Sequence, residues 1–449
     1  MTSQMVEIHT PDLKWWLAHL ENDFHPVHSI DLFVNTLKRR SVRNPTPTAV
    51  GTAQLLLRLI AAHKFTSIQN LVDYVLSLET RLSAARPREM SIRNMVRRVL
   101  GIIREEAENA GYGDHFKAAM EASQAREEPL AAKPARPPLM ASHTSFANPT
   151  QASVTSLFNI LSQSASPQAV STANSPSQSG VQTPQNAGLP PPQPLSAQKD
   201  IRPAVIQDIR ELVEELESSE TSIAEYAPQL IHKNEMIMTY GLPSTVHRLL
   251  LRAAHKREHD FTVVVVEGSP NIFKHTHGAV MNKIPLTDQD DTASEAEAAA
   301  VRKSLQERGV QVIVISDSDI FNFIGRVNKV FLAANYVLAD GSVLATAGAL
   351  NVACAAKALM KPVVVVAGSH VLCPVTSYHQ EVLVEMGQPV TVGYEEGELL
   401  DRADFPNPLV DLVEPQFVTM FVTNNGIVSK TTINRATLDL YHMPEADLV

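Results

Sequence analysis

The carboxyl-terminal half of the chain carries short runs of β-branched residues that helix-length segments separate. The runs begin at Met236, Phe261, Gln311, Val327 and Pro362. Continuous apolar runs of this length are typical of parallel strands that are buried on both faces of a sheet. Helical segments between such strands imply right-handed crossovers. The pattern therefore predicts an α/β fold with a Rossmann-like, doubly wound parallel sheet.

The end of the chain is expected to complete this sheet domain. Further apolar runs lie at Val390, Leu409 and Phe417, and a helical pattern passes through Leu438 and Tyr441. In a doubly wound sheet, the loops that leave the strands at their carboxyl ends hold the ligand site. Candidate site residues should therefore lie just after the predicted strands.

The first 120 or so residues show helical periodicity instead. Pro47 suits the first turn of one helix, Thr66 or Ser67 can cap a second, and Ser91 can cap a third that ends near Gly111. The second of these helices has an apolar stripe of Ile68, Leu71, Val72, Val75 and Leu76. Stripes with this spacing pack together, so we predict a small helical bundle.

A long low-complexity segment separates the two patterns. Between Pro137 and Gln198 the chain has no Asp, Glu, Lys or Arg and is dominated by Ser, Pro, Gln, Ala and Thr. Such a segment buries too little apolar surface to offset its ordering entropy. We therefore predict a helical domain over 1–122, a disordered linker over 123–200, and a connecting helix with the Rossmann-like domain over 201–449.

Composition narrows the class of protein. The formal net charge of -10 argues against broad nucleic-acid binding, because phosphates need basic surfaces. Cys354 and Cys373, the two cysteines, lie in or beside apolar runs, which predicts buried free thiols and a reducing compartment. The chain has neither a signal-peptide pattern nor an apolar run long enough for a bilayer, so we expect a cytoplasmic protein without membrane contact.

One strand-to-helix junction has the form of a phosphate site. Gly241 follows the first predicted strand, and Ser244 and Thr245 open the next helix, where free amides and the helix dipole can hold an anion. The junction lacks both the G-x-G-x-x-G spacing and a P-loop lysine. We favour the alternative interpretation, a turn followed by a helix N-cap.

Other polar residues give weak signals for chemistry. Asp317 and Asp319 could act as an acid–base pair, but helix capping explains them more simply. His275 and His277 lack partner ligands at metal spacing, so a polar loop is favoured and no metal site is expected. Asp340 precedes a glycine and suits a tight turn after a strand.

The helical domain carries basic residues that could contact a partner. They are Lys38, Arg39, Arg40 and Arg43 in one segment and Arg93, Arg97, Arg98 and Arg104 in another. Nearby acidic residues balance them, and no aromatic residues interleave for stacking on bases. We interpret them first as solvated helix faces.

Several segments in the same order carry a family resemblance. They are Met238 to Val246, Ser316 to Phe321, Arg326 to Val330, Val337 to Gly341, and Ala353 to Lys357. They resemble the regulatory alpha, beta and delta subunits of eukaryotic translation initiation factor 2B, which share their fold with methylthioribose-1-phosphate and ribose-1,5-bisphosphate isomerases. Three more segments are similar to motifs of the beta group: Leu32 to Arg40, Asn94 to Glu106, and Phe421 to Gly426.

The resemblance also implies that the isomerase chemistry is absent. Gly241 and Asn335 stand at the positions of the isomerases' catalytic cysteine and aspartate, and Ser269 and Thr346 at those of a substrate-binding arginine and lysine. A glycine has no proton to give, and an amide is not a general base. We expect no catalytic residue and no cofactor. The residues that remain of a vestigial ligand pocket are Gly241, Ser244, Thr245, Asn335 and Asp340.

By resemblance, the chain is a non-catalytic regulatory subunit of the guanine nucleotide exchange factor for initiation factor 2. Such subunits scaffold the complex and help sense phosphorylation of the alpha subunit of initiation factor 2. The implied partners are the delta subunit by direct pairing, the alpha, gamma and epsilon subunits, and initiation factor 2, with Lys38, Arg39, Arg40 and Arg43 as contact candidates. The alternative is a sugar-phosphate isomerase, or a sugar-phosphate or nucleotide-binding protein, of the same fold. Residues 271–300 are longer than in the beta pattern, so no contact is assigned there.

Overall fold

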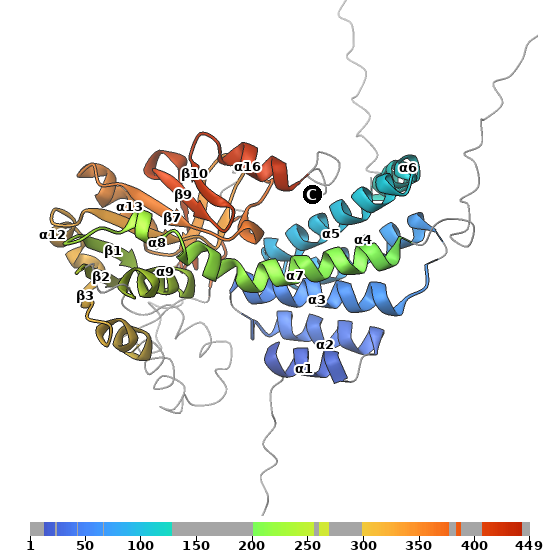
Figure 1. Cartoon of the computed structure of the whole chain (residues 1–449), viewed down its shortest axis with the longest axis horizontal. Helices are drawn as coiled ribbons and strands as arrows, with labels where there is room; N and C mark the ends of the chain where they lie inside the picture. Colours follow the sequence, from blue (N-terminus) through green and yellow to red (C-terminus); the bar gives the residue numbers. More distant parts are fainter. Residues whose placement is uncertain are drawn as a thin grey trace, which may run out of the picture. The chain divides into compact units, whose positions relative to one another are not determined.

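The computed structural model has a helical part and a sheet part (Figure 1). It describes residues 13–22, 25–42, 44–65, 67–127, 201–255, 260–268, 299–376, 383–387 and 406–441. Both parts belong to one compact unit, Met1–Ser123 with Gln193–Val449. The predicted linker lies outside the described residues, apart from its first five, so the linker and the domain boundaries stay predictions.

The helical part is built on amphipathic helices whose apolar stripes meet in one core. Its helices are α1 (Leu13–Asn22), α2 (Pro26–Lys38), α3 (Pro45–Ala62), α4 (Ile68–Ala85), α5 (Met90–Asn109), α6 (Gly113–Glu127) and α7 (Arg202–Ala224). The stripe predicted on α4 faces this core, and α5 contributes Met95 and Val99, which are fully buried. In Figure 1, α7 runs from this bundle towards the sheet. The helical bundle is therefore confirmed.

Helix ends follow the predicted caps in two cases out of three. The Ser67 hydroxyl accepts a hydrogen bond from the Asn70 N–H at 3.2 Å, so Ser67 caps α4. Gly111 has a φ of +82°, a conformation that suits glycine just beyond the end of α5. The prediction that Ser91 caps α5 is wrong. Ser91 lies inside the helix and is fully buried. Its hydroxyl bonds Tyr336 and does not cap the local backbone.

The main sheet is mostly parallel, as the apolar runs predict. Its described strands are β1 (Met236–Tyr240), β2 (Thr262–Glu267), β3 (Gln311–Ser316), β4 (Lys329–Ala333), β7 (Val363–Val366), β9 (Met420–Thr423) and β10 (Gly426–Ser429). The order is β10-β9-β7-β4-β1-β2-β3, with β10 antiparallel to β9 and the other neighbours parallel. The six parallel strands have the Rossmann order, which reverses between β1 and β4.

Helices cover both faces of this sheet. Helix α9 (Ser244–Ala254) and the helix at 299–306 contribute Leu249 and Leu305 to the hydrophobic cluster on one face. Helices α12 (Ile320–Ile324) and α13 (Ala349–Ala358) contribute Ile324 and Val352 to the cluster on the other face. The short α8 (Ala227–Leu230) joins α7 to β1. The prediction of a doubly wound α/β fold is confirmed.

A second, antiparallel sheet is not evident from the sequence pattern. It contains β5 (Tyr336–Val337), β6 (Val343–Thr346) and β8 (Val410–Val413), in the order β5-β6-β8. The chain reverses after β5 at Gly341, whose φ of +84° fits the predicted tight turn. Helix α16 (Ile433–Leu440) matches the predicted last helix, and the run at Val390 lies outside the described residues.

The two cysteines lie in different surroundings. Both are free, and Cys373 is buried as expected. Cys354 is exposed, so its predicted burial is wrong: it lies on the outer side of α13, while Ala353 and Ala355 on the same helix face the core. Among the described residues, no helix is both long enough and apolar enough to cross a membrane.

Candidate functional site

The point where the strand order reverses brings two predicted site residues together. Gly241 follows β1 and Asn335 follows β4, and these strands are neighbours in the sheet. The Gly241 N–H donates to the Val266 carbonyl at 2.8 Å, with φ of +62°, and the Asn335 N–H donates to the Leu344 carbonyl at 2.8 Å. Both residues therefore lie at the edge of the sheet where Rossmann-type proteins bind ligands.

Ser244 and Thr245 open helix α9, but neither is its N-cap. Pro243 holds that position, and its side chain makes no cap hydrogen bond. The Ser244 hydroxyl instead donates to Glu220 Oε1 at 2.6 Å, and Glu220 Oε2 also pairs with Arg248 Nε at 2.8 Å. The predicted N-cap is wrong because Ser244 ties α9 to α7, which the local sequence does not reveal.

Asp340 shapes the turn between β5 and β6. Its carboxylate accepts hydrogen bonds from the Ser342 N–H at 2.9 Å and the Ser342 hydroxyl at 3.0 Å. The adjacent Gly341 lies against Ile433 of α16, since a Cβ built on Gly341 would be 3.3 Å from the Ile433 side chain. Asp340 thus has a local partner in the turn, while Gly241 and Asn335 share the sheet edge.

The Tyr240 side chain, at the end of β1, fills the space beside two glycines of other segments, Gly268 and Gly348. A Cβ built on Gly268, after β2, would lie 2.5 Å from the Tyr240 hydroxyl oxygen. A Cβ built on Gly348, before α13, would lie only 2.1 Å from the same oxygen. Two glycines therefore make room for the phenol at the crevice. The local sequence pattern identifies Tyr240 only as a strand residue, because the glycines that accommodate it lie far along the chain.

Carboxylates surround this phenol. Burial, together with Asp317 and Asp411, raises the pKa of Tyr240 to about 12. Burial also raises the pKa of Asp317, whose Oδ1 has no hydrogen-bond partner within the described ranges. The capping interpretation is therefore wrong for Asp317. Asp319 does occupy the N-cap of α12, although its carboxylate bonds the Asn322 amide at 3.2 Å and not the backbone.

The start of α13 is already occupied by a carboxylate of the chain. Asp411 Oδ2, on β8, accepts hydrogen bonds from the N–H groups of Gly348 at 2.7 Å and Leu350 at 3.1 Å. These amides and the helix dipole would otherwise attract an external anion. The crevice thus holds a neutral phenol and carboxylates. These carboxylates would repel the negative charge of a sugar phosphate at this point.

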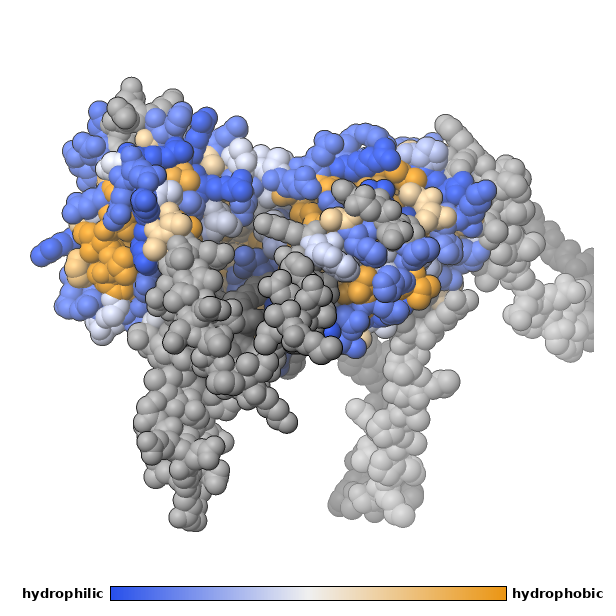
Figure 2. Space-filling view, turned by 90° about the horizontal axis from the view of Figure 1, so that it is seen from below, coloured by the Kyte–Doolittle hydropathy of each residue, from blue (hydrophilic) through white to orange (hydrophobic). Residues whose placement is uncertain are grey.

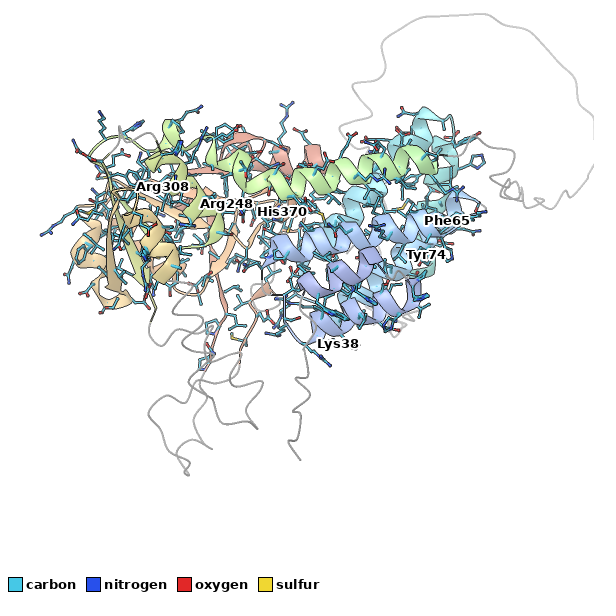
Figure 3. The ribbon with its side chains drawn as sticks, turned by 60° about the horizontal axis from the view of Figure 1, so that its bottom comes forward. Lys38, Phe65, Tyr74, Arg248, Arg308 and His370 are labelled. Atoms are coloured by element: carbon cyan, nitrogen blue, oxygen red, sulfur yellow. The ribbon has the colours of Figure 1, made fainter. Side chains whose placement is uncertain are left out.

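The predicted basic contact segment is only partly exposed. Lys38 and Arg39 are exposed at the end of α2, and Figure 3 shows Lys38 pointing away from the helices. Arg40 has a φ of +54° and forms an ion pair with Glu385 of the sheet part. Arg43 lies outside the described residues. Lys38 and Arg39 are therefore the members that solvent and a partner can reach.

The second basic segment does not form a solvated face. Arg97 is only 3% exposed, and burial lowers its pKa. Arg98 Nη2 pairs with Glu215 Oε2 at 2.7 Å, and Arg93 Nε lies 3.5 Å from Glu79 Oε1. The interpretation as a solvated face is wrong for Arg97 and Arg98, because α5 is enclosed by α7 and the sheet part.

Metal chemistry finds no support in the part of the chain that the structure describes. No group of three or more His, Cys, Asp or Glu residues there could hold a metal ion. His275 and His277 lie outside the described residues. Neither Gly241 nor Asn335 can act as a general acid or base at the sheet edge.

The fold and the crevice together define a class: a two-part protein with a Rossmann-type sheet whose strand-reversal point is filled by its own tyrosine. The sequence model of the initiation factor 2 subunit family matches residues 41–283 and 290–430. This chain belongs to the initiation factor 2 subunit family.

Comparisons with known proteins agree with this assignment. The chain is 30% identical over 422 residues to translation initiation factor eIF2B subunit beta of Schizosaccharomyces pombe, covering 93% of this chain and 96% of that protein. It is 29% identical over 419 residues to the same subunit of Dictyostelium discoideum, covering 91% and 94%. These matches confirm the resemblance to the beta group.

More distant relatives include enzymes. The chain is 25% identical over 227 residues to ribose 1,5-bisphosphate isomerase of Archaeoglobus fulgidus, covering 51% of this chain and 64% of that protein. Among solved structures, the tetrameric eIF2B-beta2-delta2 complex of C. thermophilum contains a chain with the same fold, at a TM-score of 0.60 and 23% identity, covering 96% of this chain and 100% of that one.

Proposed function

We propose that this protein is a non-catalytic regulatory subunit of the guanine nucleotide exchange factor for translation initiation factor 2. It scaffolds that complex in the cytoplasm and helps sense phosphorylation of the alpha subunit of initiation factor 2. Membership of the initiation factor 2 subunit family supports the proposal, as does the name of the relatives that match over nine-tenths of the chain.

The filled crevice is the single observation that carries the non-catalytic assignment. Tyr240 occupies the space beside Gly268 and Gly348, and the charged groups that act on this phenol are the carboxylates of Asp317 and Asp411. A phosphorylated sugar would have to displace the ring and approach like charges. With Gly241 and Asn335 where the isomerases have their reactive groups, the crevice is a vestige, to which Ser244, Thr245 and Asp340 also belong.

The proposed partners follow from the relatives. One solved structure of this fold is a beta–delta tetramer, so we infer direct pairing with a delta subunit and, through it, association with the alpha, gamma and epsilon subunits. An exposed apolar surface supports an assembling role, because large apolar patches often mark interfaces. Val314 of β3 is 46% exposed and Phe321 of α12 is 65% exposed. Figure 2 shows apolar surface at the end of the molecule where β3 and α12 lie.

Initiation factor 2 is proposed to contact the basic end of α2. Lys38 and Arg39 are exposed there, while Arg40 is held by Glu385 and would contribute through its backbone conformation and remaining donors. Arg43 completes the proposed contact set. A basic segment suits an acidic partner surface and would mainly affect the association rate.

The proposal can be tested by co-expressing the full chain with a delta-type subunit. Native mass spectrometry should detect a complex of defined stoichiometry, and the complex should raise nucleotide exchange by an epsilon-type subunit and make it sensitive to phosphorylated initiation factor 2. The purified chain should not convert ribose 1,5-bisphosphate. The alternative, an isomerase, would be supported by two results together: the chain forms no complex, and it converts the sugar in a reaction that Asp340→Asn abolishes.

A further inference from the structure

Helix α5 carries a polar stripe on the side opposite its apolar core. Ser91, Asn94 and Arg98 are spaced at i, i+3 and i+7, so they lie on one face of the helix. The spacing alone predicts an exposed polar face. Instead, each of these side chains contacts residues of the sheet part or of α7, more than one hundred positions further along the chain.

Asn94 makes the central contact of this stripe. Its Nδ2 donates to the carbonyls of His370 at 3.1 Å and Leu372 at 3.2 Å, and lies 3.2 Å from Cys373 Sγ. These partners lie in and just after the 3-10 turn Ser369–Val371, which follows β7. Asn94 is fully buried, so losing its amide would remove the Asn94 donor from the His370 carbonyl inside the protein, while the Leu372 carbonyl would keep the Tyr441 hydroxyl at 2.9 Å.

A second contact ties the start of α5 to β5. The Ser91 hydroxyl lies 3.0 Å from the Tyr336 hydroxyl, and both hydroxyls donate to the Glu89 carboxylate. Arg86 Nη1 pairs with the other oxygen of this carboxylate at 2.8 Å. Glu89 is only 4% exposed, so its charge depends on these donors for stabilisation.

A third contact runs through α7 to the ends of β7 and β9. Glu215 Oε2 pairs with Arg98 at 2.7 Å, while Glu215 Oε1 accepts hydrogen bonds from the Ser369 hydroxyl at 2.8 Å and the Asn424 amide at 3.1 Å. Asn424 Oδ1 also accepts from the Ser369 N–H at 2.7 Å. Figure 3 shows His370, the residue after Ser369, where the helices meet the sheet part.

We propose that these three contacts form a latch that holds the helical part and the sheet part as one rigid body. A displacement imposed on the helical part would then reach the carboxyl ends of β7 and β9. Purely apolar surfaces can slide over one another, but directional hydrogen bonds around buried groups permit one register. Opening one contact leaves buried polar groups unpaired, so the contacts should open together. The latch itself rests on the contacts alone. The proposed function is needed only to say which partner would displace the helical part.

The two cysteines allow a direct test in the full-length chain. Cys373 is buried at the latch and Cys354 is exposed on α13. A thiol-reactive disulfide reagent, followed by peptide mass spectrometry, measures the labelling rate of each. In the wild-type chain Cys373 should react at least ~100-fold more slowly than Cys354, because it reacts only when the latch opens.

Two latch variants and one control complete the design. Asn94→Ala should raise the labelling rate of Cys373 roughly tenfold or more. The loss of the Asn94 hydrogen bond raises the thiol pKa further, which by itself would slow labelling. Glu215→Gln changes the third contact, away from the thiol, and should also accelerate Cys373. Gly101→Ala, on the same helix with open space at its Cβ, should leave both rates unchanged.

The dependence on denaturant separates latch opening from global unfolding. In the variants, labelling of Cys373 should be nearly independent of low urea concentrations, since local opening exposes little surface. Far-UV circular dichroism checks that each variant is folded. If Asn94→Ala does not fold, the result for Glu215→Gln alone tests the latch. Equal labelling rates for the two cysteines in the wild type, or no acceleration in a folded Glu215→Gln chain, would overturn the latch. A chain that fails to bind a delta-type subunit but keeps Cys373 protected would refute the proposed function alone.

Discussion

The Tyr240 hydroxyl lies so close to Gly348 that a Cβ at position 348 would be 2.1 Å from its oxygen. Gly348 also has a φ of +102°, which disfavours any side chain. The Tyr240 ring can therefore take this position only because residue 348 has no side chain. This pair joins the end of β1, at the strand-reversal point, to the start of α13.

Gly348→Ala should destabilise the protein by about 2–4 kcal/mol, because the methyl group both clashes with Tyr240 and strains the backbone. In a Tyr240→Ala background the same change should cost only about 1–2 kcal/mol, the backbone share. Urea unfolding of the four chains gives the coupling. Equal costs in both backgrounds would show that the ring does not fill the crevice in solution. Gly101→Ala, with open space at its Cβ, is the control and should be neutral or stabilising.

Asp411→Ala should lower the free energy of unfolding by about 1–2 kcal/mol, because two amides at the start of α13 lose their acceptor. Asp411→Asn keeps one acceptor oxygen and should cost less. The exposed Asp439 of α16 provides the control, and Asp439→Ala should stay within about 0.5 kcal/mol of the wild type. A loss for Asp411→Ala no larger than that for Asp439→Ala would contradict the capping role.

His370 should make stability depend on pH. Burial, with a smaller contribution from Arg98, lowers its pKa from 6.5 to about 4, and its Nε2 lies 3.0 Å from the Thr46 hydroxyl. The unfolded chain takes up this proton near pH 6.5, while the folded chain does so only near pH 4. The stabilisation is therefore complete above pH 6.5 and is lost as the pH falls towards 4, by on the order of 3 kcal/mol.

The measurement compares unfolding free energies at pH 7 and pH 4.5 for the wild type and for His370→Gln. The difference between the two pH values should shrink in the variant, because glutamine does not titrate. The exposed His255 supplies a matched control, and His255→Gln should keep the wild-type difference. An unchanged difference in His370→Gln would show that this imidazole is not buried in its neutral form.

Charge reversal at Lys38 and Arg39 should weaken binding of initiation factor 2 by on the order of tenfold at low salt, without changing assembly with a delta-type subunit. Surface plasmon resonance and native mass spectrometry measure the two properties separately. Reversal at the exposed Arg252 of α9 serves as the control and should change neither. Unchanged binding would remove Lys38 and Arg39 from the proposed contact.

Arg40 should behave differently from its neighbours. Arg40→Glu breaks the ion pair with Glu385 as well as reversing a surface charge, so it should also lower stability. A second change, Glu385→Arg, restores an opposite-charge pair and should recover stability but not the binding of initiation factor 2. Recovery of both properties would mean that Arg40 acts only through its ion pair.

The fold was predictable because its signals are local. The β-branched runs of β2 and β7 predict buried parallel strands, and the apolar stripe on α4 predicts a helix that packs in a bundle. The antiparallel sheet was not predictable, since β5 has only two residues and the paired residues of β6 and β8 lie 64 to 70 positions apart. Short strands carry too few residues for periodicity to register.

The candidate site was predictable only in part. Family motifs located Gly241 and Asn335, which do lie at one sheet edge. They did not indicate that Tyr240 fills the crevice, or that Asp317 faces it rather than capping a helix. Those roles depend on which residues come into contact across the sheet. The pattern of residues along one segment does not reveal contacts between distant segments.

Periodicity along the chain was sufficient to define the α/β class, the helical bundle and the strand ends where a site would lie, because burial repeats at the spacing of each element. Folding in three dimensions decided the surroundings of individual polar residues. Ser91 changed from an expected cap to a partner of Tyr336, 245 positions away. Arg97 changed from an expected surface charge to a buried one. A polar side chain's role follows from its contacts and burial, and these exist only once distant segments have packed together.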